Sequence, residues 1–329
     1  MTKRGRANLL LLFAAVIWGF AFTAQKVGGQ SMGPFTYSSV RFAMGGALLA
    51  FIVIPIMSAR KPLSSQERRA ATLAVLPSAL PCGLLLAIAV NIQQVALEFT
   101  SVGNAAFITG LYLVFTPLLG LFFGGRVNGL TLIGIAVAVS GSYFIAVTGD
   151  FTIGSGDVIV LGAAVAFAIH ILVVDNVAKR VDPIKFSAAQ FFSCGFFSAV
   201  GALFFDEAPF TGFGDTIIPL LYGGFISVGI AYTLQVIGQI DALPSHGALI
   251  MSMESVFGAV GGALLLQEYM SARGLLGAAL MTCGLIVSQL GQGKDTDALT
   301  SAGAAESSDA GESVASTGPA DSVDSLVGS

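Results

Sequence analysis

The chain has 329 residues, of which 55% are hydrophobic and only 10% are charged, and its formal net charge is −4. Soluble domains carry about 25% charged residues. The composition therefore excludes an ordinary soluble globular protein and offers no basic surface for nucleic acid. Cys82, Cys194 and Cys283 each lie inside an apolar run without Cys-x-x-Cys or Cys/His spacing, which excludes a disulfide framework and a cysteine metal site.

Ten apolar runs follow one another along the chain. A hydrocarbon core of roughly 30 Å requires about 20 apolar residues of helix, and each run has about that length. Lys3, Arg4 and Arg6 precede the first run as in a signal peptide, but this run is too long for such a peptide, so we expect an uncleaved first helix. The expected membrane spans are 8–27, 34–57, 72–97, 101–123, 128–147, 157–177, 184–205, 215–238, 244–267 and 272–291.

The segment after the last run has a different composition. Residues 294–329 are rich in Ser, Ala, Gly and Asp and contain no aromatic side chain. Such a segment cannot bury enough apolar surface to offset the entropy lost on ordering. We therefore expect a disordered, acidic cytoplasmic tail.

The basic residues predict the orientation of the spans, because Lys and Arg in short loops mark the cytoplasmic side. With ten spans and a cytoplasmic N-terminus, most bases fall on the cytoplasmic side, and several acids fall on the outer side. This pattern predicts a multi-pass protein of the cytoplasmic membrane, plasma or inner, with both termini in the cytoplasm. The bases are Lys3, Arg4, Arg6, Arg60, Lys61, Arg68, Arg69, Arg126, Lys179, Arg180, Lys185 and Lys294, and the outer acids are Glu98, Asp150, Asp206, Glu207 and Asp215.

The two halves of the chain show a weak internal similarity. The segment Gly103–Phe115 resembles Ser245–Phe257, and Ser39–Phe42 resembles Ala188–Phe191. The alternative is a chance similarity between apolar helices. If the repeat is real, residues 1–148 and 149–293 each hold five helices, and the odd number inserts the halves in opposite directions. Inverted repeats are typical of alternating-access transporters, whose substrate site lies near the midplane between the halves.

Glu254 and Tyr112 occupy equivalent positions in the proposed repeat, both near the middle of a span. An ionisable residue at membrane depth costs roughly 2.5–3.5 kcal/mol on insertion scales, so it is expected to face a cavity or a partner. Glu254 is either a site for a proton or a substrate cation, or a buried carboxyl hydrogen-bonded between helices. The Tyr112 hydroxyl either contacts substrate or is satisfied by a neighbouring helix.

Two further residues stand out in the first half of the chain. Arg41 lies about two turns into the second span, where it either pairs with Glu98 or snorkels, or else binds an anionic group of a substrate. Trp18 is too deep in the first span for an interfacial residue, so it forms either an aromatic wall of a cavity or part of the helix packing.

The remaining candidates have a structural alternative in each case. Gln93 and Gln94 fit amide contacts between helices, and His170 fits a hydrogen-bonded structural histidine as well as a proton relay. Tyr232 and Gln235 in the eighth span are similar candidates. The predicted set for substrate binding or coupling is Glu254, Tyr112, Trp18, Arg41, Gln94, His170, Tyr232 and Gln235.

Several motifs are absent from the sequence. There is no phosphate-binding loop of an ATP-driven motor, no His-Glu-x-x-His and no Gly-x-Ser-x-Gly elbow. With His170 and His246 as the only histidines, a catalytic triad is implausible. We therefore expect no enzyme activity, no cofactor and no metal.

The order of four motifs resembles the drug/metabolite transporter superfamily, EamA type. The motifs are Ala15–Phe20, Arg41-Phe42, Thr100–Ala106 with Leu111–Pro117, and Met253–Phe257 with Leu264–Glu268. The chain departs from the common family pattern at Gly125, where many members have Glu, and at Ser255, where many have Pro. The resemblance implies an all-α membrane protein of ten transmembrane helices in two inverted five-helix repeats, in a family of mostly metabolite exporters.

The sequence thus favours a secondary active transporter that exports a small organic metabolite, with protons as a candidate coupling ion. The alternative is a non-transporting membrane receptor or scaffold protein, which requires no polar cavity between the halves. The expected partners are membrane lipid, a small-molecule substrate and protons, with no nucleic acid. Amino acids, drugs, nucleosides and cations all remain open as substrates, and both a monomer and a homodimer remain open.

Overall fold

The computed structural model describes residues 2–60, 64–100, 102–122, 127–146, 154–265, 272–288 and 290, and the chain is helical through most of these ranges. The predicted disordered tail, residues 294–329, lies outside the described residues, as do Lys61, Arg126 and Asp150. The helices are α1 (Lys3–Ser31), α2 (Pro34–Ala47), α3 (Ile54–Arg60), α4 (Ser65–Phe99), α5 (Val102–Gly110), α6 (Tyr112–Phe122), α7 (Gly129–Ala146), α8 (Ser155–Ala178), α9 (Pro183–Phe205), α10 (Phe213–Leu221), α11 (Thr233–Gln239), α12 (Pro244–Met251) and α13 (Glu254–Leu265), with π-helices η1 (Leu48–Val53) and η2 (Tyr222–Tyr232).

Within the described residues, seven helices are long and apolar enough to cross a membrane. Two shorter apolar helices, Gly129–Phe144 and Ala272–Ser288, coincide with the predicted spans 128–147 and 272–291. The predicted span 244–267 is covered by α12 and α13 together. The all-α membrane fold is therefore confirmed, and each predicted span contains helix.

The cytoplasmic ends of two helices extend beyond the predicted spans. We expected Arg68 and Arg69 in a loop, but α4 begins at Ser65. Its start is a capping box, in which the Glu67 backbone N–H donates to the Ser64 hydroxyl over 3.2 Å and the Ser64 backbone N–H donates to the Glu67 carboxylate over 2.8 Å. At α1 the Gly5 N–H donates to the Thr2 hydroxyl over 3.1 Å. These polar caps prolong the helices where hydropathy alone ends them.

Two of the predicted spans are interrupted near their middle. Leu111 separates α5 from α6, and Ser252 with Met253 separates α12 from α13. At both places the backbone forms short i→i+3 hydrogen bonds, such as Leu111 N to Ile108 O (3.1 Å) and Met253 N to Ile250 O (3.2 Å). The helices therefore tighten at these points, where hydrogen bonds between residues three apart take the place of the α-helical pattern.

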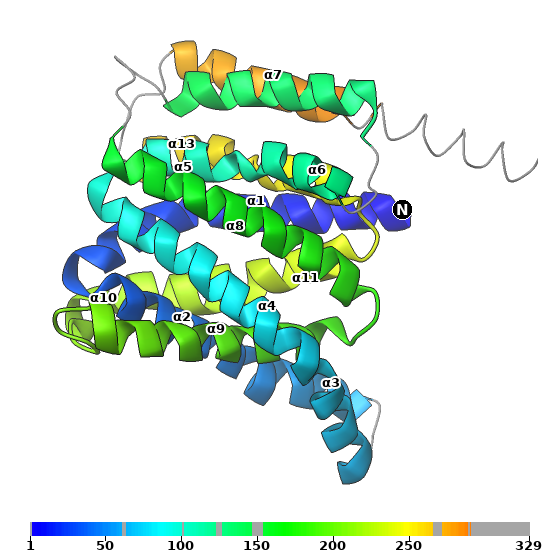
Figure 1. Cartoon of the computed structure of the whole chain (residues 1–329), viewed down its shortest axis with the longest axis vertical. Helices are drawn as coiled ribbons and strands as arrows, with labels where there is room; N and C mark the ends of the chain where they lie inside the picture. Colours follow the sequence, from blue (N-terminus) through cyan, green and yellow to red (C-terminus); the bar gives the residue numbers. More distant parts are fainter. Residues whose placement is uncertain are drawn as a thin grey trace, which may run out of the picture.

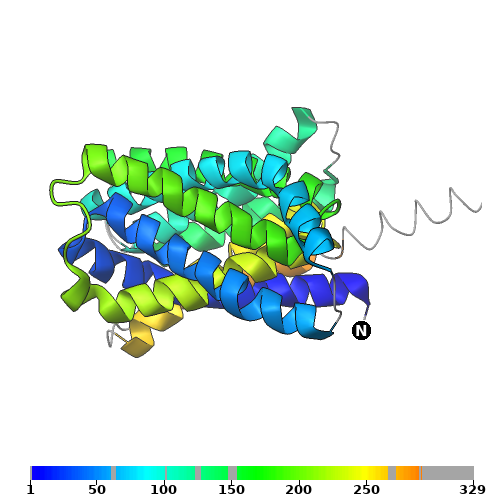
Figure 2. The ribbon, with the colours of Figure 1, turned by 90° about the horizontal axis from the view of Figure 1, so that it is seen from below.

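The helices form a bundle with an adjoining outer pair. Figure 1 shows α7 and the helix 272–288 as a separate layer, with α1, α5, α6, α8 and α13 in the middle and α2, α9 and α10 on the opposite face. Figure 2 shows α9 running alongside α2. Glycines permit close approaches between helices: a Cβ atom on Gly141 would lie 2.5 Å from the Gly277 carbonyl oxygen, and one on Gly19 would lie 2.7 Å from the Gly258 nitrogen.

The two ends of the bundle differ in charge. The N-terminus of α1 and the α8–α9 connection lie at one end (Figure 1), where Arg6 forms an ion pair of 3.5 Å with Asp241 in the α11–α12 connection. We call this the basic end. At the other end, which we call the acidic end, Glu98, Asp206 and Glu207 line a cavity of about 740 Å³ between α1, α4 and α9.

Candidate functional site

Two predicted spans are interrupted, and the first residue after each interruption contacts the other. Tyr112 begins α6 and Glu254 begins α13. The Tyr112 hydroxyl donates a hydrogen bond of 3.1 Å to Glu254 Oε1, and both side chains are 4% exposed. The hydrogen bond between α6 and α13 agrees with the structural alternative for both residues, because each side chain finds its partner in the other.

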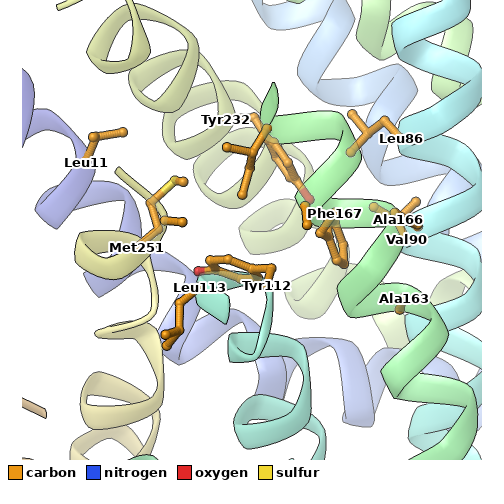
Figure 3. Close-up of a cluster of buried hydrophobic side chains, with 14 of the residues drawn as sticks. Leu11, Leu86, Val90, Tyr112, Leu113, Ala163, Ala166, Phe167, Tyr232 and Met251 are labelled. Atoms are coloured by element: carbon orange, nitrogen blue, oxygen red, sulfur yellow. The ribbon is translucent and has the colours of Figure 1, made fainter. Parts of the chain in front are cut away.

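A central cavity surrounds this pair. Figure 3 shows Tyr112, Phe167 and Tyr232 around the same space, from three different elements of the fold. The cavity has a volume of about 40 Å³, which is room for a few water molecules, since one water requires about 10–15 Å³ on this measure. It is lined by Trp18, Phe22, Gln25, Arg41, Gln93, Thr109, Tyr112, Phe167, Ile171, Ser227, Tyr232, Gln235, Met251 and Glu254.

The cavity contains most of the predicted site residues, but two of them lie elsewhere. Gln94 donates from Nε2 to the backbone carbonyl oxygen of Gln25 over 3.0 Å and ties α4 to α1. Its neighbour Gln93 lines the cavity. His170 is fully buried between α8 and α9, where its Nε2 lies 3.4 Å from Gln190 Oε1. The structural interpretation applies to both residues.

The expected ion pair between Arg41 and Glu98 is not formed among the described residues. Arg41 is only 2% exposed, so it does not snorkel either. Its guanidinium lies over the rings of Tyr37 and Phe42, with its central carbon 5.5 and 5.2 Å from their centroids. Arg41 lines the central cavity, one turn after Tyr37 on α2.

Aromatic rings connect the guanidinium to the other side of the cavity. The ring of Tyr232 lies 5.6 Å from that of Phe42 and 4.7 Å from that of Trp18, edge to face in the second case. Trp18 is positioned by the close contact of Gly19 with Gly258, which seats α1 against α13. Trp18 and Tyr232 therefore form an aromatic wall.

Gln25, Thr109 and Ser227 line the cavity but are not among the residues predicted from the sequence, and Gln93, expected only as an amide contact between helices, lines it as well. One signal was present in the sequence: Trp18, Phe22 and Gln25 are spaced as i, i+4 and i+7, which places them on one face of α1. Gln93 donates from Nε2 to the Thr109 hydroxyl over 3.0 Å. This contact joins two helices, so no local sequence pattern predicts it.

Further cavities lie toward both ends of the bundle. The acidic-end cavity is described above, and one of about 490 Å³ opens between α6, α8 and α12, with Thr116, Asp175 and His246 in its lining. His246 Nε2 lies 3.0 Å from the Ser288 carbonyl oxygen, which ties α12 to the outer pair. Within the part of the chain that the structure describes, no group of side chains has the composition of a metal site.

Comparison with known proteins identifies the family. The sequence profile of the EamA-like transporter family matches residues 5–147 and 154–289. The chain belongs to this family. It is therefore a multi-pass membrane transporter, of a family that is not an enzyme class, and the resemblance seen in the sequence motifs is confirmed.

Individual relatives of this transporter agree with that assignment. An "Uncharacterized transporter" of Archaeoglobus fulgidus is 27% identical over 88% of this chain and 87% of its own length. A protein of Escherichia coli named "Probable amino-acid metabolite efflux pump" is 24% identical over 86% of this chain and 95% of its own. A solved structure titled "Crystal structure of protein" matches with a TM-score of 0.69 at 20% identity, over 86% of this chain and 96% of that one, which supports the fold.

Proposed function

We propose that this transporter is a secondary active exporter of a small organic metabolite, working by alternating access and coupled to protons. The observation that carries the proposal is the hydrogen-bonded pair of Tyr112 and Glu254, which lies at two interrupted helices and faces a cavity lined by both polar and apolar side chains. Interrupted helices in corresponding positions of two halves are the strongest pointer to a transport site in such folds. A receptor or scaffold, our alternative, has no need for this cavity.

The proposal includes ten membrane crossings in two inverted repeats, residues 1–148 and 149–293. Two findings support it. The family profile matches each half of the chain. The alignment of Gly103–Phe115 with Ser245–Phe257 sets Leu111 against Met253 and Tyr112 against Glu254, so both interruptions fall at equivalent positions. Five helices per half then insert the halves in opposite directions.

The orientation in the cytoplasmic membrane follows from the charges of the two ends. The basic end, with the N-terminus and Arg6, corresponds to the cytoplasm under the positive-inside rule, and the acidic end to the outside. The cavities toward the two ends then lie on either side of the central one. This arrangement suits a passage that is opened from one side at a time.

Proton coupling rests on the surroundings of Glu254. Its carboxyl is buried at membrane depth, it accepts a hydrogen bond from the neutral Tyr112 hydroxyl, and none of the described residues forms an ion pair with it. A carboxylate without a counter-charge in such a place is costly, and binding a proton removes that cost. Glu254 is thus the residue that carries the proton in our proposal.

The test is transport by the purified protein in proteoliposomes with an imposed pH gradient. Flux of the metabolite should follow the gradient, and Glu254→Gln, which keeps the shape and the Tyr112 contact, should reduce gradient-driven flux to that of empty vesicles. Glu98→Gln at the acidic end is the matched control and should retain coupling. Flux that ignores the gradient in the unmodified protein would remove protons from the mechanism, and full coupling in Glu254→Gln would make Glu254 structural.

A further inference from the structure

The central cavity and the acidic-end cavity approach one another along two helices. On α1, Gln25 lines the central cavity and Gly29, four residues later, lines the acidic-end cavity. On α4, Gln93 lines the first cavity and Val95 lines the second. An α-helix rises about 1.5 Å per residue, so the two linings are about 6 Å apart along α1. A layer of protein about one helical turn thick therefore separates the two cavities.

This layer is packed on two neighbouring glycines of α1. A Cβ atom on Gly28 would lie 2.3 Å from Cε2 of the Tyr37 ring, and one on Gly29 would lie 2.9 Å from Nε2 of Gln94. The Tyr37 ring comes from α2 and the Gln94 amide from α4, and both lie directly against the α1 backbone. Both side chains are buried, and neither lines either of the two cavities. They therefore fill the space between the cavities.

The two side chains of the layer are fixed to different degrees. The Tyr37 hydroxyl donates to the Pro219 carbonyl oxygen over 3.1 Å, which ties the ring to α10. Gln94 donates from Nε2 to the backbone carbonyl oxygen of Gln25 over 3.0 Å, but its Oε1 is buried without a partner among the described residues. A buried carbonyl without a hydrogen bond is costly, and contact with water removes that cost. Gln94 is therefore the side chain of this layer that is free to move.

The acidic-end cavity offers room for this movement. It has a volume of about 740 Å³ and is lined by Gly29, the residue against which the Gln94 amide lies. Rotation of the Gln94 side chain into this cavity breaks one hydrogen bond, and water there replaces it and reaches Oε1 as well. The central cavity, which has a volume of only about 40 Å³ in this conformation, then joins the acidic-end cavity.

We propose that Gln94 is a gate between the central cavity and the acidic end, closed in this structure and opened by rotation of its side chain away from Gly29. The inference rests on the proposed function only in taking the two cavities as parts of one passage. The closure itself follows from the contacts of Gln94 with Gly29 and Gln25, and it is tested without transport.

The test measures access to the central cavity from each face of the membrane. Ser227→Cys places a thiol in the lining of the central cavity, at a residue that is 1% exposed. The membrane-impermeant anion 2-sulfonatoethyl methanethiosulfonate is added to right-side-out or inside-out vesicles that contain the full chain. Mass spectrometry follows labelling of the introduced thiol, so Cys82, Cys194 and Cys283 stay in place. We expect slow labelling of this single variant from both faces.

Two further substitutions, each combined with Ser227→Cys, should open the gate. Because the labelling rate follows the open population, Gln94→Ala should raise the rate from the acidic end by more than about tenfold. Gly29→Ala should raise it by a smaller factor, because the added Cβ displaces only the end of the Gln94 side chain. Alanine is favoured over glycine inside a helix, so this variant should fold.

Gln94→Met is the matched control. It loses the same hydrogen bond as Gln94→Ala but keeps an unbranched side chain of similar length over Gly29. Labelling should therefore stay nearly as slow as in the chain with Ser227→Cys alone. Equally fast labelling of Gln94→Met and Gln94→Ala would overturn the gate, because it would report a general loosening of the helices.

The remaining outcomes separate the gate from the exporter. Faster labelling of Gln94→Ala and Gly29→Ala from one face supports the gate, and the face tests the proposed orientation. Unchanged labelling of both variants, or faster labelling from both faces at once, would overturn the gate and leave the exporter intact. Faster labelling from one face in a chain without flux in proteoliposomes would leave the gate intact and remove the transport function.

Discussion

At the acidic end of the bundle the chain itself engages the buried and half-buried carboxylates, whereas around the central cavity polar side chains are left with unused hydrogen-bonding groups. Asp206 accepts from the backbone N–H groups of Phe35 and Thr36, over 3.3 and 2.7 Å, and so caps the start of α2 from the end of α9. Asp157 accepts from the Thr100 hydroxyl and from the Gly154 N–H. These hydrogen-bonded carboxylates hold helices and loops together. The polar atoms of the cavity that lack a partner lower the stability of the fold, but they can still form hydrogen bonds to a bound molecule.

The largest expected effect is on transport, and it comes from removing a polar side chain that lines the central cavity. Gln235→Leu deletes a buried side-chain carbonyl that has no hydrogen-bond partner among the described residues, with little change in volume. Stability should stay level or rise by about 1 kcal/mol, while transport should fall by about tenfold or more, equivalent to about 1.4 kcal/mol of lost binding. Thermal unfolding in detergent and flux in proteoliposomes measure the two effects.

Gln239→Leu is the control for that variant, one turn further along the same helix. Gln239 has a buried Oε1 without a partner among the described residues, as Gln235 does, but its Nε2 donates to the Ile171 carbonyl oxygen over 3.0 Å and ties α11 to α8, and the residue does not line the cavity. Its loss should lower stability and leave flux per folded molecule unchanged. If Gln235→Leu also lowered stability without affecting flux, the distinction between the two kinds of polar group would fail.

A smaller effect, confined to stability, is expected at the acidic end. Asp206→Ala removes both hydrogen bonds at the start of α2 and should lower the free energy of unfolding by about 1–2 kcal/mol. Flux per folded molecule should not change. Glu207→Ala, at the exposed neighbouring residue, should change neither the free energy of unfolding nor the flux. A loss of flux in folded Asp206→Ala would assign this end a part in transport.

The smallest effect is expected at Thr36. Its hydroxyl accepts from the Phe210 backbone N–H over 3.1 Å, and valine has nearly the same shape without that acceptor. Thr36→Val should cost about 0.5–1 kcal/mol, because the Phe210 N–H lies near the surface and can bind water instead. Thr36→Ser retains the acceptor and should unfold at nearly the temperature of the unmodified chain. Equal losses in both would indicate that packing, not the hydrogen bond, stabilises the junction.

The sequence predicts the helices well because an apolar run of about 20 residues has few alternatives to a spanning helix. It predicts Tyr112 and Glu254 as site residues because polar groups are rare in such runs. It does not predict the interruptions at Leu111 and Ser252–Met253, since each of these runs is long enough to cross the membrane as one helix.

The difference between the predicted site residues and the cavity lining has a physical cause at α4. Adjacent helix residues point about 100° apart, so the choice between Gln93 and Gln94 depends on the rotation of α4 about its axis, which hydropathy does not fix. The structure places Gln93 in the cavity lining, whereas Gln94 contacts the backbone of α1. The expected pairing of Arg41 with Glu98 rests only on their similar depth in the membrane. In the structure the guanidinium lies over the rings of Tyr37 and Phe42, which belong to the same helix.

The π-helix η2 gives the aromatic wall a means of adjustment. A π turn bonds residues five apart where an α turn bonds residues four apart, so it stores one surplus residue. Sliding the boundary between η2 and α11 by a single position exchanges one backbone hydrogen bond for another and rotates the side chains at the boundary by about a quarter turn. Tyr232 is the last residue of η2, with its ring 4.7 Å from Trp18. Such a shift of the π-helix boundary would change the direction of the Tyr232 ring while the helix stays continuous.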